Sequence, residues 1–382
     1  MARAALRLLG FLLCWAGLRA GEVRRPVPAL EINGREYVRI ADVATRLKLT
    51  RRWLEAGRKV QLTDATHHLE LEAGGRFGGL EMVMDGLNVF LGDPVLARGG
   101  DLFVSRIDLE HRMVPLLHGL WNGPPPRHPV IIAIDPGHGG VDPGKENLPL
   151  HLQEKTLTLD TAFRLKKLLE AAGYQTVMTR TDDHSVAPTK ELDLQRRPEI
   201  AVVAHADLFV SIHFNSSSPD VRPHGTEVYL FPPAHQNSTE SSLDHLDDRE
   251  PSKDHPGPSS ANLFDAWNVI LSHAMHRQLL AHLHTEDRGE KLKHLGVLRG
   301  LQCPGILVES AFLSNDAEAR RAATPAFRQQ IAEAMLAGIN AYAAEVDSLR
   351  PSVPAVRPAA PVSGPAPAAP AAKPFSPPQR PS

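Results

Sequence analysis

The segment VIIAIDPGHGG, residues 130–140, places five apolar residues directly before Asp135, Pro136, His138 and three glycines. A short, continuously apolar run is typical of a strand that is covered on both faces, as in an α/β sheet. Glycines allow the chain to turn sharply after such a strand. The segment therefore predicts a buried strand that delivers polar, ligand-capable side chains at its carboxyl end.

Beyond this segment, strand patterns alternate with helical patterns. In LTLDTAFRLKKLLEAAG, residues 157–173, Phe163 and four leucines fall on a helical period, and Gly173 can cap the helix. Strands that alternate with helices favour an α/β layered domain. The other predicted strands are YQTVMTR (174–180), DLFVSIH (207–213), GTEVYLF (225–231) and GILVE (305–309), and the other predicted helices are EIAVVAHA (199–206), NLFDAWNVILSHAMHRQLLAHL (262–283) and PAFRQQIAEAMLAGINAYAAEV (325–346).

The residues before this domain have a different character. EINGREYVRI, residues 31–40, has an Asn-Gly pair between two short strand patterns, which predicts a hairpin, and a short amphipathic helix pattern follows. We predict a small α+β accessory domain at 27–120, a Pro-rich linker at 121–129 and the α/β domain at 130–347. The hairpin-helix pattern resembles the copper amine oxidase N-terminal-like domains that occur as stalks on exported bacterial proteins.

Two further segments do not fit a packed domain. Residues 234–260 are polar and contain Pro and Gly near their end, so we predict an insertion or flexible loop within the α/β domain. Residues 351–382 are rich in Pro and Ala and cannot bury a core, so we predict a disordered tail.

The amino terminus has the pattern of an export signal. Residues 1–21 begin with basic side chains, continue with an apolar run and end in small residues, which predicts a cleaved secretory signal peptide. An uncleaved anchor is the alternative interpretation. Cys14 lacks the small residues that precede a lipidated cysteine. After cleavage only Cys303 remains, so we expect no internal disulfide and interpret Cys303 as a buried small residue.

The composition argues against an electrostatic partner. The formal net charge is −2, and 42% of the residues are hydrophobic, which suffices for a substantial core. Proteins that bind nucleic acid usually concentrate basic residues on one face. We therefore expect no nucleic-acid partner, and no stable membrane span after signal removal.

Polar side chains converge at the predicted sheet edge. His138, His213 and Glu309 each end a different apolar strand pattern, and Glu154 begins the helix after the first strand. In open α/β sheets, ligands bind at the carboxyl ends of the strands. Two neutral imidazoles and one carboxylate make a three-ligand zinc set, and a second carboxylate can move a proton. Singly, each residue has a plainer interpretation, such as a surface histidine or a solvated helix start.

Four ordered motifs then identify a family. IDPGHGG, LQEKTLTL, LFVSIHFN and ILVESAFLSN resemble the motif series of zinc-dependent N-acetylmuramoyl-L-alanine amidases of the Amidase_3 type, over nearly all of residues 130–345. The resemblance implies a mixed, mostly parallel sheet with helices on both faces. It also implies that His138, Glu154 and His213 bind Zn²⁺, and that Glu309 is the general base and acid.

The resemblance further implies the reaction and its control. Family members hydrolyse the amide between N-acetylmuramic acid and L-alanine in peptidoglycan, using zinc-activated water. We thus expect an exported enzyme of the periplasm or cell envelope. Several members carry a helix in the polar insertion that blocks the zinc until a partner removes it. Residues 234–262 occupy that position, with Glu240 and Glu250 as candidate plugs, although the prolines there argue against a long blocking helix.

Two rival functions stay open on the sequence. One is a catalytically inactive peptidoglycan-binding protein, which retention of all four site residues argues against. The other is a zinc hydrolase of another stem-peptide amide, which depends on the shape of the groove. The variant loop GKENLPLHLQ, residues 144–153, and Phe214 differ from the usual family pattern and are expected to shape that groove.

Overall fold

The computed structural model describes residues 27–118, 127–239 and 258–349. The predicted signal peptide at 1–21 and the tail at 351–382 lie outside these residues. So do most of the predicted linker and insertion, at 121–126 and 240–257. Among the described helices, none combines the length and the apolar character that a membrane crossing requires.

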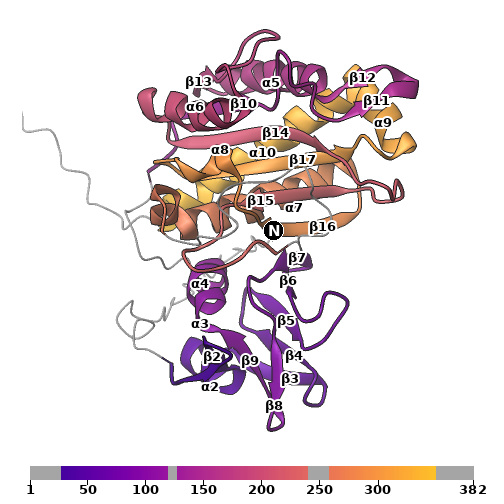
Figure 1. The fold of residues 1–382 in the computed structure, drawn as a ribbon. Helices are drawn as coiled ribbons and strands as arrows, with labels where there is room; N and C mark the ends of the chain where they lie inside the picture. The colour runs from indigo at the N-terminus through magenta and orange to yellow at the C-terminus, as the bar shows by residue number, and fades with distance from the viewer. Residues whose placement is uncertain (1–26, 119–126, 240–257, 350–382) are drawn as a thin grey trace, which may run out of the picture.

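A large mixed sheet organises the chain, in the strand order β13-β10-β14-β17-β15-β16-β7-β6-β5-β4-β3 (Figure 1). In residues 127–349, β13, β10, β14 and β17 run parallel, β15 is antiparallel to β17, and β16 is parallel to β15. This part is the predicted mixed, mostly parallel sheet. Its strands are β10 (Ile131–Pro136), β13 (Gln175–Met178), β14 (Leu208–Asn215), β15 (Thr226–Leu230), β16 (Asp287–Leu292) and β17 (Gly305–Phe312).

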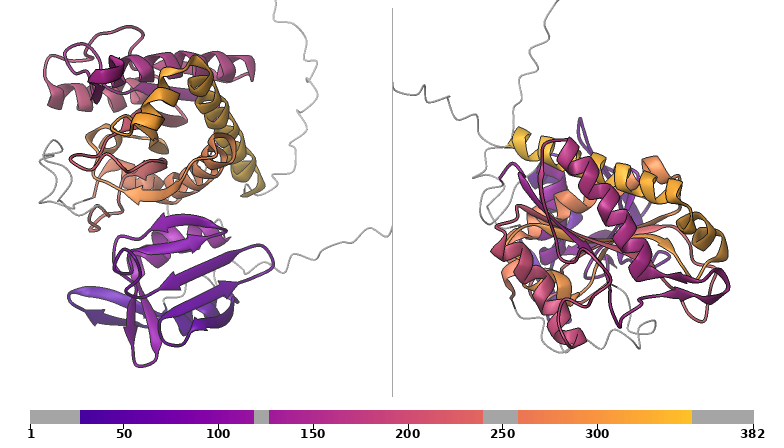
Figure 2. Two further views of the ribbon diagram at one scale, coloured as in Figure 1. Left: turned by 90° about the vertical axis from the view of Figure 1, so that its right-hand side faces the viewer. Right: turned by 90° about the horizontal axis from the view of Figure 1, so that it is seen from above.

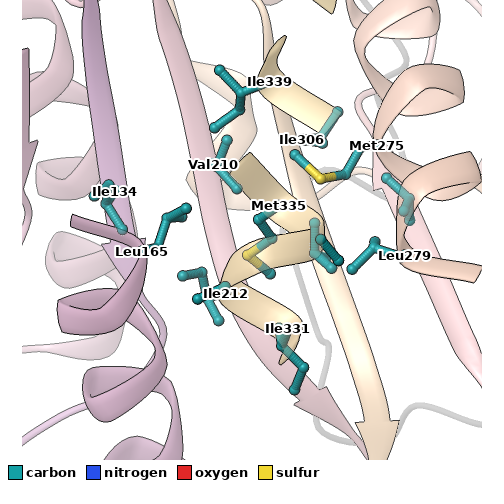
Figure 3. Packing of buried hydrophobic residues seen from close by; sticks show 14 of the residues in the cluster. Ile134, Leu165, Val210, Ile212, Met275, Leu279, Ile306, Ile331, Met335 and Ile339 are labelled. Carbon is teal, nitrogen blue, oxygen red and sulfur yellow. The ribbon is translucent and has the colours of Figure 1, made fainter. Parts of the chain in front are cut away.

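Helices cover both faces of this sheet (Figure 2). Alternate strand residues belong to two different hydrophobic clusters, one on each face. Ile134, Val210 and Ile306 pack against α5, α7 and α10, as Figure 3 shows, whereas Phe209 and Leu307 pack on the opposite side with α6 and α8. Burial on both faces explains why these strands are continuously apolar in sequence. The helices are α5 (Glu154–Ala171), α6 (Lys190–Val203), η4 (Ser260–Phe264), α7 (Asp265–Leu283), α8 (Gly296–Arg299), α9 (Asp316–Ala323) and α10 (Pro325–Leu349), and the loop after β10 holds β11 (Glu146–Asn147), η2 (Leu148–Leu150) and β12 (Leu152–Gln153).

Residues 27–118, the N-terminal block, have a separate hydrophobic core and a second, four-stranded sheet in the order β1-β2-β9-β8. The predicted hairpin forms at Asn33 and Gly34, both of which have positive φ. The elements of this block are β1 (Ala29–Ile32), β2 (Arg35–Arg39), α2 (Ile40–Leu47), β3 (Thr50–Glu55), β4 (Lys59–Thr63), β5 (His68–Glu72), β6 (Glu81–Met84), β7 (Leu87–Phe90), β8 (Leu96–Arg98), β9 (Asp101–Ser105), α3 (Arg106–Asp108), η1 (Leu109–Met113) and α4 (Val114–His118).

The two parts of the chain share the large sheet, because β7 pairs in parallel with β16 at Val89 and Glu290. Around this pairing, Asn88 donates its backbone N–H to Asp287, and the Arg112 side chain donates to the backbone carbonyl of Glu290. The division into an accessory domain at 27–120 and a catalytic domain at 130–347 stays a prediction. The large sheet, however, includes strands from both sides of that boundary.

Some local expectations were wrong. Phe163, placed on the buried side of its helix by spacing, is 43% exposed. Gln236, within the predicted flexible insertion, is fully buried and donates to Asp108 of the N-terminal block. The helix predicted at 199–206 begins nine residues earlier, at Lys190, where the Thr189 side chain caps it. Strand β16 was not predicted at all.

Candidate metal centre and active site

Three predicted ligand residues come together from separate elements. His138 follows β10, Glu154 is the first residue of α5 and His213 lies in β14; one ligand atom from each lies within 4.8 Å of the other two. The His138 and His213 rings are edge to face with centroids 4.9 Å apart. The loop after β10 and the parallel pairing of β10 with β14 thus bring distant residues to one sheet edge.

Glu154 lies at the centre of this group and is buried. Its Oε2 is 3.1 Å from His138 Nε2, and its Oε1 is 3.0 Å from His213 Nδ1. Backbone N–H groups of Lys145 and Phe214 also donate to the two oxygens. Burial raises the pKa of Glu154, but both histidines outweigh that effect and hold the pKa well below its usual range. The group is therefore a buried carboxylate.

His138 is held in an uncommon conformation, with a φ of 62°. Two buried arginines secure the backbone around it: Arg197 donates to the carbonyl oxygens of Pro136 and His138, and Arg180 donates to those of Pro136 and Gly137. A left-handed conformation persists at a functional site only when its surroundings enforce it. These arginines supply that enforcement.

Asp142 orients the His138 ring from the other side. Its Oδ2 is 3.0 Å from Nδ1, which leaves Nε2 directed at Glu154. Burial lowers the pKa of His138, but the charges of Glu154 and Asp142 and their hydrogen bonds outweigh burial and raise the pKa to about 10. Because metal ligation requires a neutral imidazole, a cation would compete with a proton here.

Two glycines leave room for the ligand side chains. A Cβ on Gly137 would lie 2.3 Å from His213 Nε2. A Cβ on Gly144, whose φ is +65°, would lie 2.6 Å from both Glu154 Oε2 and His138 Cδ2. Both positions therefore require glycine for space, and Gly144 requires it for its backbone conformation as well.

Glu309 lies in β17, directly beside His213 in β14 in the parallel register. Its Oε2 is buried and accepts no hydrogen bond from the described residues. Burial is the main reason that the pKa of Glu309 is raised well above 4.5, and the charges of Glu154 and Glu227 raise it further. Burying a carboxyl oxygen without a hydrogen-bond partner costs free energy, and such groups are typical of functional sites.

The donor set suits a zinc ion. Two imidazoles and a carboxylate on one side leave other positions open, as catalytic zinc sites do. The hydrogen bond that Asp142 makes to His138 is the kind that fixes the tautomer of a metal-binding histidine. The residues present thus fit the cofactor that the sequence suggested.

Sequence reasoning was inaccurate at some positions. His213 and Glu309 lie within their strands rather than at the predicted ends, because β14 and β17 extend further. Asp135, another polar residue at a predicted strand end, is buried and accepts hydrogen bonds from Arg197, Thr179 and Ser211 instead of joining the His138-Glu154-His213 group. Asp142, Arg180 and Glu227 were missed. Asp142 follows His138 by four residues in a Gly-rich turn, which was the one available signal for it.

Comparison with known proteins agrees with this geometry. The family described as N-acetylmuramoyl-L-alanine amidase, Amidase_3, matches residues 132–341. AmiC of Neisseria meningitidis is 33% identical over 282 residues, which cover 63% of this chain and 64% of that protein. AmiC of Escherichia coli O6:H1 is 33% identical over 270 residues, with 66% and 62% covered. The chain therefore matches less than two thirds of the length of either relative.

Among solved structures, AmiC2 of Nostoc punctiforme is 28% identical, with 56% of this chain and 96% of that chain covered and a TM-score of 0.43. The family match begins at residue 132, so it does not include the N-terminal block. The resemblance of that block to copper amine oxidase N-terminal-like domains stays a prediction.

Proposed function

The chain belongs to the Amidase_3 family of N-acetylmuramoyl-L-alanine amidases, and from this we propose that it hydrolyses the amide between N-acetylmuramic acid and L-alanine in peptidoglycan. The observation that carries the proposal is the position of Glu309, whose buried Oε2 has no hydrogen-bond partner among the described residues, beside His213 of the His138-Glu154-His213 group.

We propose that His138, Glu154 and His213 hold Zn²⁺. The support is the donor set, the mutual distances and the buried, hydrogen-bonded carboxylate of Glu154. When bound, zinc supplies Lewis acidity, which polarises a carbonyl group and makes water easier to deprotonate.

Glu309 has the role of proton carrier in this proposal. Its Oε2 accepts a proton from the attacking water and returns it to the amine nitrogen of L-alanine as the C–N bond breaks. A raised pKa suits this task, because the group must exist in both protonation states during one turnover. Arg180 and Arg197 contribute by fixing the backbone that carries His138.

We also propose that the protein acts outside the cytoplasm, in the periplasm or cell envelope, as the leader pattern at 1–21 predicts. Control by an activator that acts on residues 234–262 stays a prediction. Residues 240–257, with Glu240 and Glu250, lie outside the described residues. Gln236, near the start of the segment, donates a hydrogen bond to Asp108 of the N-terminal block. An activator would therefore act on the residues that follow Gln236.

Digestion of purified peptidoglycan, with and without a chelator, tests the proposed reaction. Mass analysis of the products should find intact glycan and free stem peptides that begin with L-alanine, and only without the chelator. Shortened stem peptides on the glycan would instead indicate a hydrolase of another amide. Binding to peptidoglycan without any cleavage would indicate the inactive binding protein.

A further inference from the structure

A second buried carboxylate, Glu227 of β15, lies next to the active site and has four side-chain partners. Its Oε2 accepts hydrogen bonds from Asn215 at 2.9 Å and from the Tyr229 hydroxyl at 2.6 Å. Its Oε1 accepts from Arg288 Nε at 2.5 Å and lies 3.0 Å from Lys291 Nζ. Only 1% of the residue is exposed, so these partners, rather than water, stabilise its charge.

Glu227 is the direct cross-strand neighbour of Glu309 in the antiparallel pairing of β15 with β17. Side chains that are directly opposite in such a pair lie on the same face, with Cβ atoms about 5 Å apart. Two carboxyl groups this close would repel each other or compete for the same partners. Glu227 instead contacts Arg288 and Lys291 of β16, and Glu309 Oε2 accepts no hydrogen bond within the part of the chain that the structure describes.

Strand β16 supplies both cations, and the N-terminal block holds this strand. The Phe90 ring of β7 occupies the space beside Gly289, where a Cβ would lie 2.7 Å from Phe90 Cε2. Lys291 Nζ lies 5.4 Å from the centroid of the same ring. The backbone of Asn88 donates to Asp287 at the start of β16. A continuous series of contacts therefore runs from Phe90 of the N-terminal block through Lys291 to Glu227, the cross-strand neighbour of Glu309.

We propose that the N-terminal block is a positioning element of the active site. Phe90 fixes Lys291, and Lys291 with Arg288 holds Glu227 away from Glu309, so that Glu309 can exchange its proton with substrate. Phe90, Lys291 and Glu227 are positioning residues, since each acts through the next. This inference rests on the proposed amidase function, and it assigns the block a role beyond that of a stalk.

Phe90→Ala in the full chain tests the inference, with Phe103→Ala as the matched control. Both rings belong to the N-terminal block and are 6% exposed, but Phe103 lies on β9 of the separate four-stranded sheet. We expect Phe90→Ala to lower kcat on peptidoglycan fragments about tenfold, as small misplacements at a site do. KM and zinc content should stay at the wild-type values, and Phe103→Ala should keep the wild-type kcat.

If Phe90→Ala does not fold, Lys291→Met and Lys291→Arg provide the same test. The methionine variant should lose kcat, and the arginine variant should recover most of it, because charge at this position holds Glu227. Unchanged kcat in Phe90→Ala or in Lys291→Met would overturn the positioning role. A wild-type protein that cleaves no peptidoglycan would refute the proposed function itself, which separates the two failures.

Discussion

Glu309 and His213 are direct register partners in β17 and β14, so a carboxyl group and an imidazole from residues 96 positions apart share one face of the sheet. Glu154 also contacts this histidine, with its Oε1 3.0 Å from His213 Nδ1. The centre thus has two carboxyl groups in different environments: both oxygens of Glu154 accept backbone hydrogen bonds, whereas Oε2 of Glu309 has no hydrogen-bond partner in the described ranges. That difference is the basis for assigning one to the metal and the other to proton transfer.

Removal of a ligand should remove the metal. We expect His138→Ala to lose zinc, because one of three protein donors disappears. Metal analysis of the purified variant checks this. His282→Ala, at an exposed position on α7, is the control and should keep full zinc content. Full occupancy in His138→Ala would contradict the ligand set.

The partner of His138 should tune metal affinity. We expect Asp142→Ala to weaken zinc binding about 10- to 100-fold, because Nδ1 of His138 loses the group that orients its ring. Competition with a chromophoric chelator measures the affinity. Wild-type affinity in this variant would show that the arginine-held backbone alone orients the ring.

The close approach at Gly144 should be intolerant of a methyl group. Gly144→Ala places a Cβ 2.6 Å from Glu154 Oε2 at a φ of +65° and should abolish zinc binding. Gly34→Ala is the control: it has a similar φ of +74°, but no atom lies within 4 Å of the added Cβ. It should cost only about 1 kcal/mol of stability, from the left-handed backbone. Equal zinc content in both variants would contradict this prediction, because it would mean that the Glu154 side chain can move away from the added methyl group.

The junction with the N-terminal block should make stability depend on pH. Burial raises the pKa of Asp287, but hydrogen bonds from His276, Asn88 and Gly289 outweigh it, and the net pKa is lower than usual. A carboxylate with a depressed folded pKa contributes its full stability above the unfolded value, near 3.9, and loses it as the pH falls through the folded pKa. Denaturant unfolding should therefore find Asp287→Asn less stable than wild type at pH 7, with the difference narrowing below about pH 4. A constant difference from pH 7 to pH 3 would contradict this assignment.

The sequence predicted which polar residues come together better than it predicted what surrounds them. His138, Glu154, His213 and Glu309 were identifiable because each follows or begins an element with a clear apolar pattern. Strand β16, DRGEKL, has no such pattern: its charged residues Asp287, Glu290 and Lys291 contact His276, His273 and Glu227 on other elements. Local spacing carries no information about these partners. The role of Glu227 was hidden for the same reason, because its register with Glu309 exists only in the folded sheet.

Glu309→Gln separates proton transfer from metal binding, when zinc content and peptidoglycan cleavage are measured on one preparation. The side chain keeps its shape but can no longer accept and return a proton. We expect wild-type zinc content together with loss of nearly all turnover. Cleavage at the wild-type rate with zinc retained would contradict the assignment of Glu309 as the proton carrier.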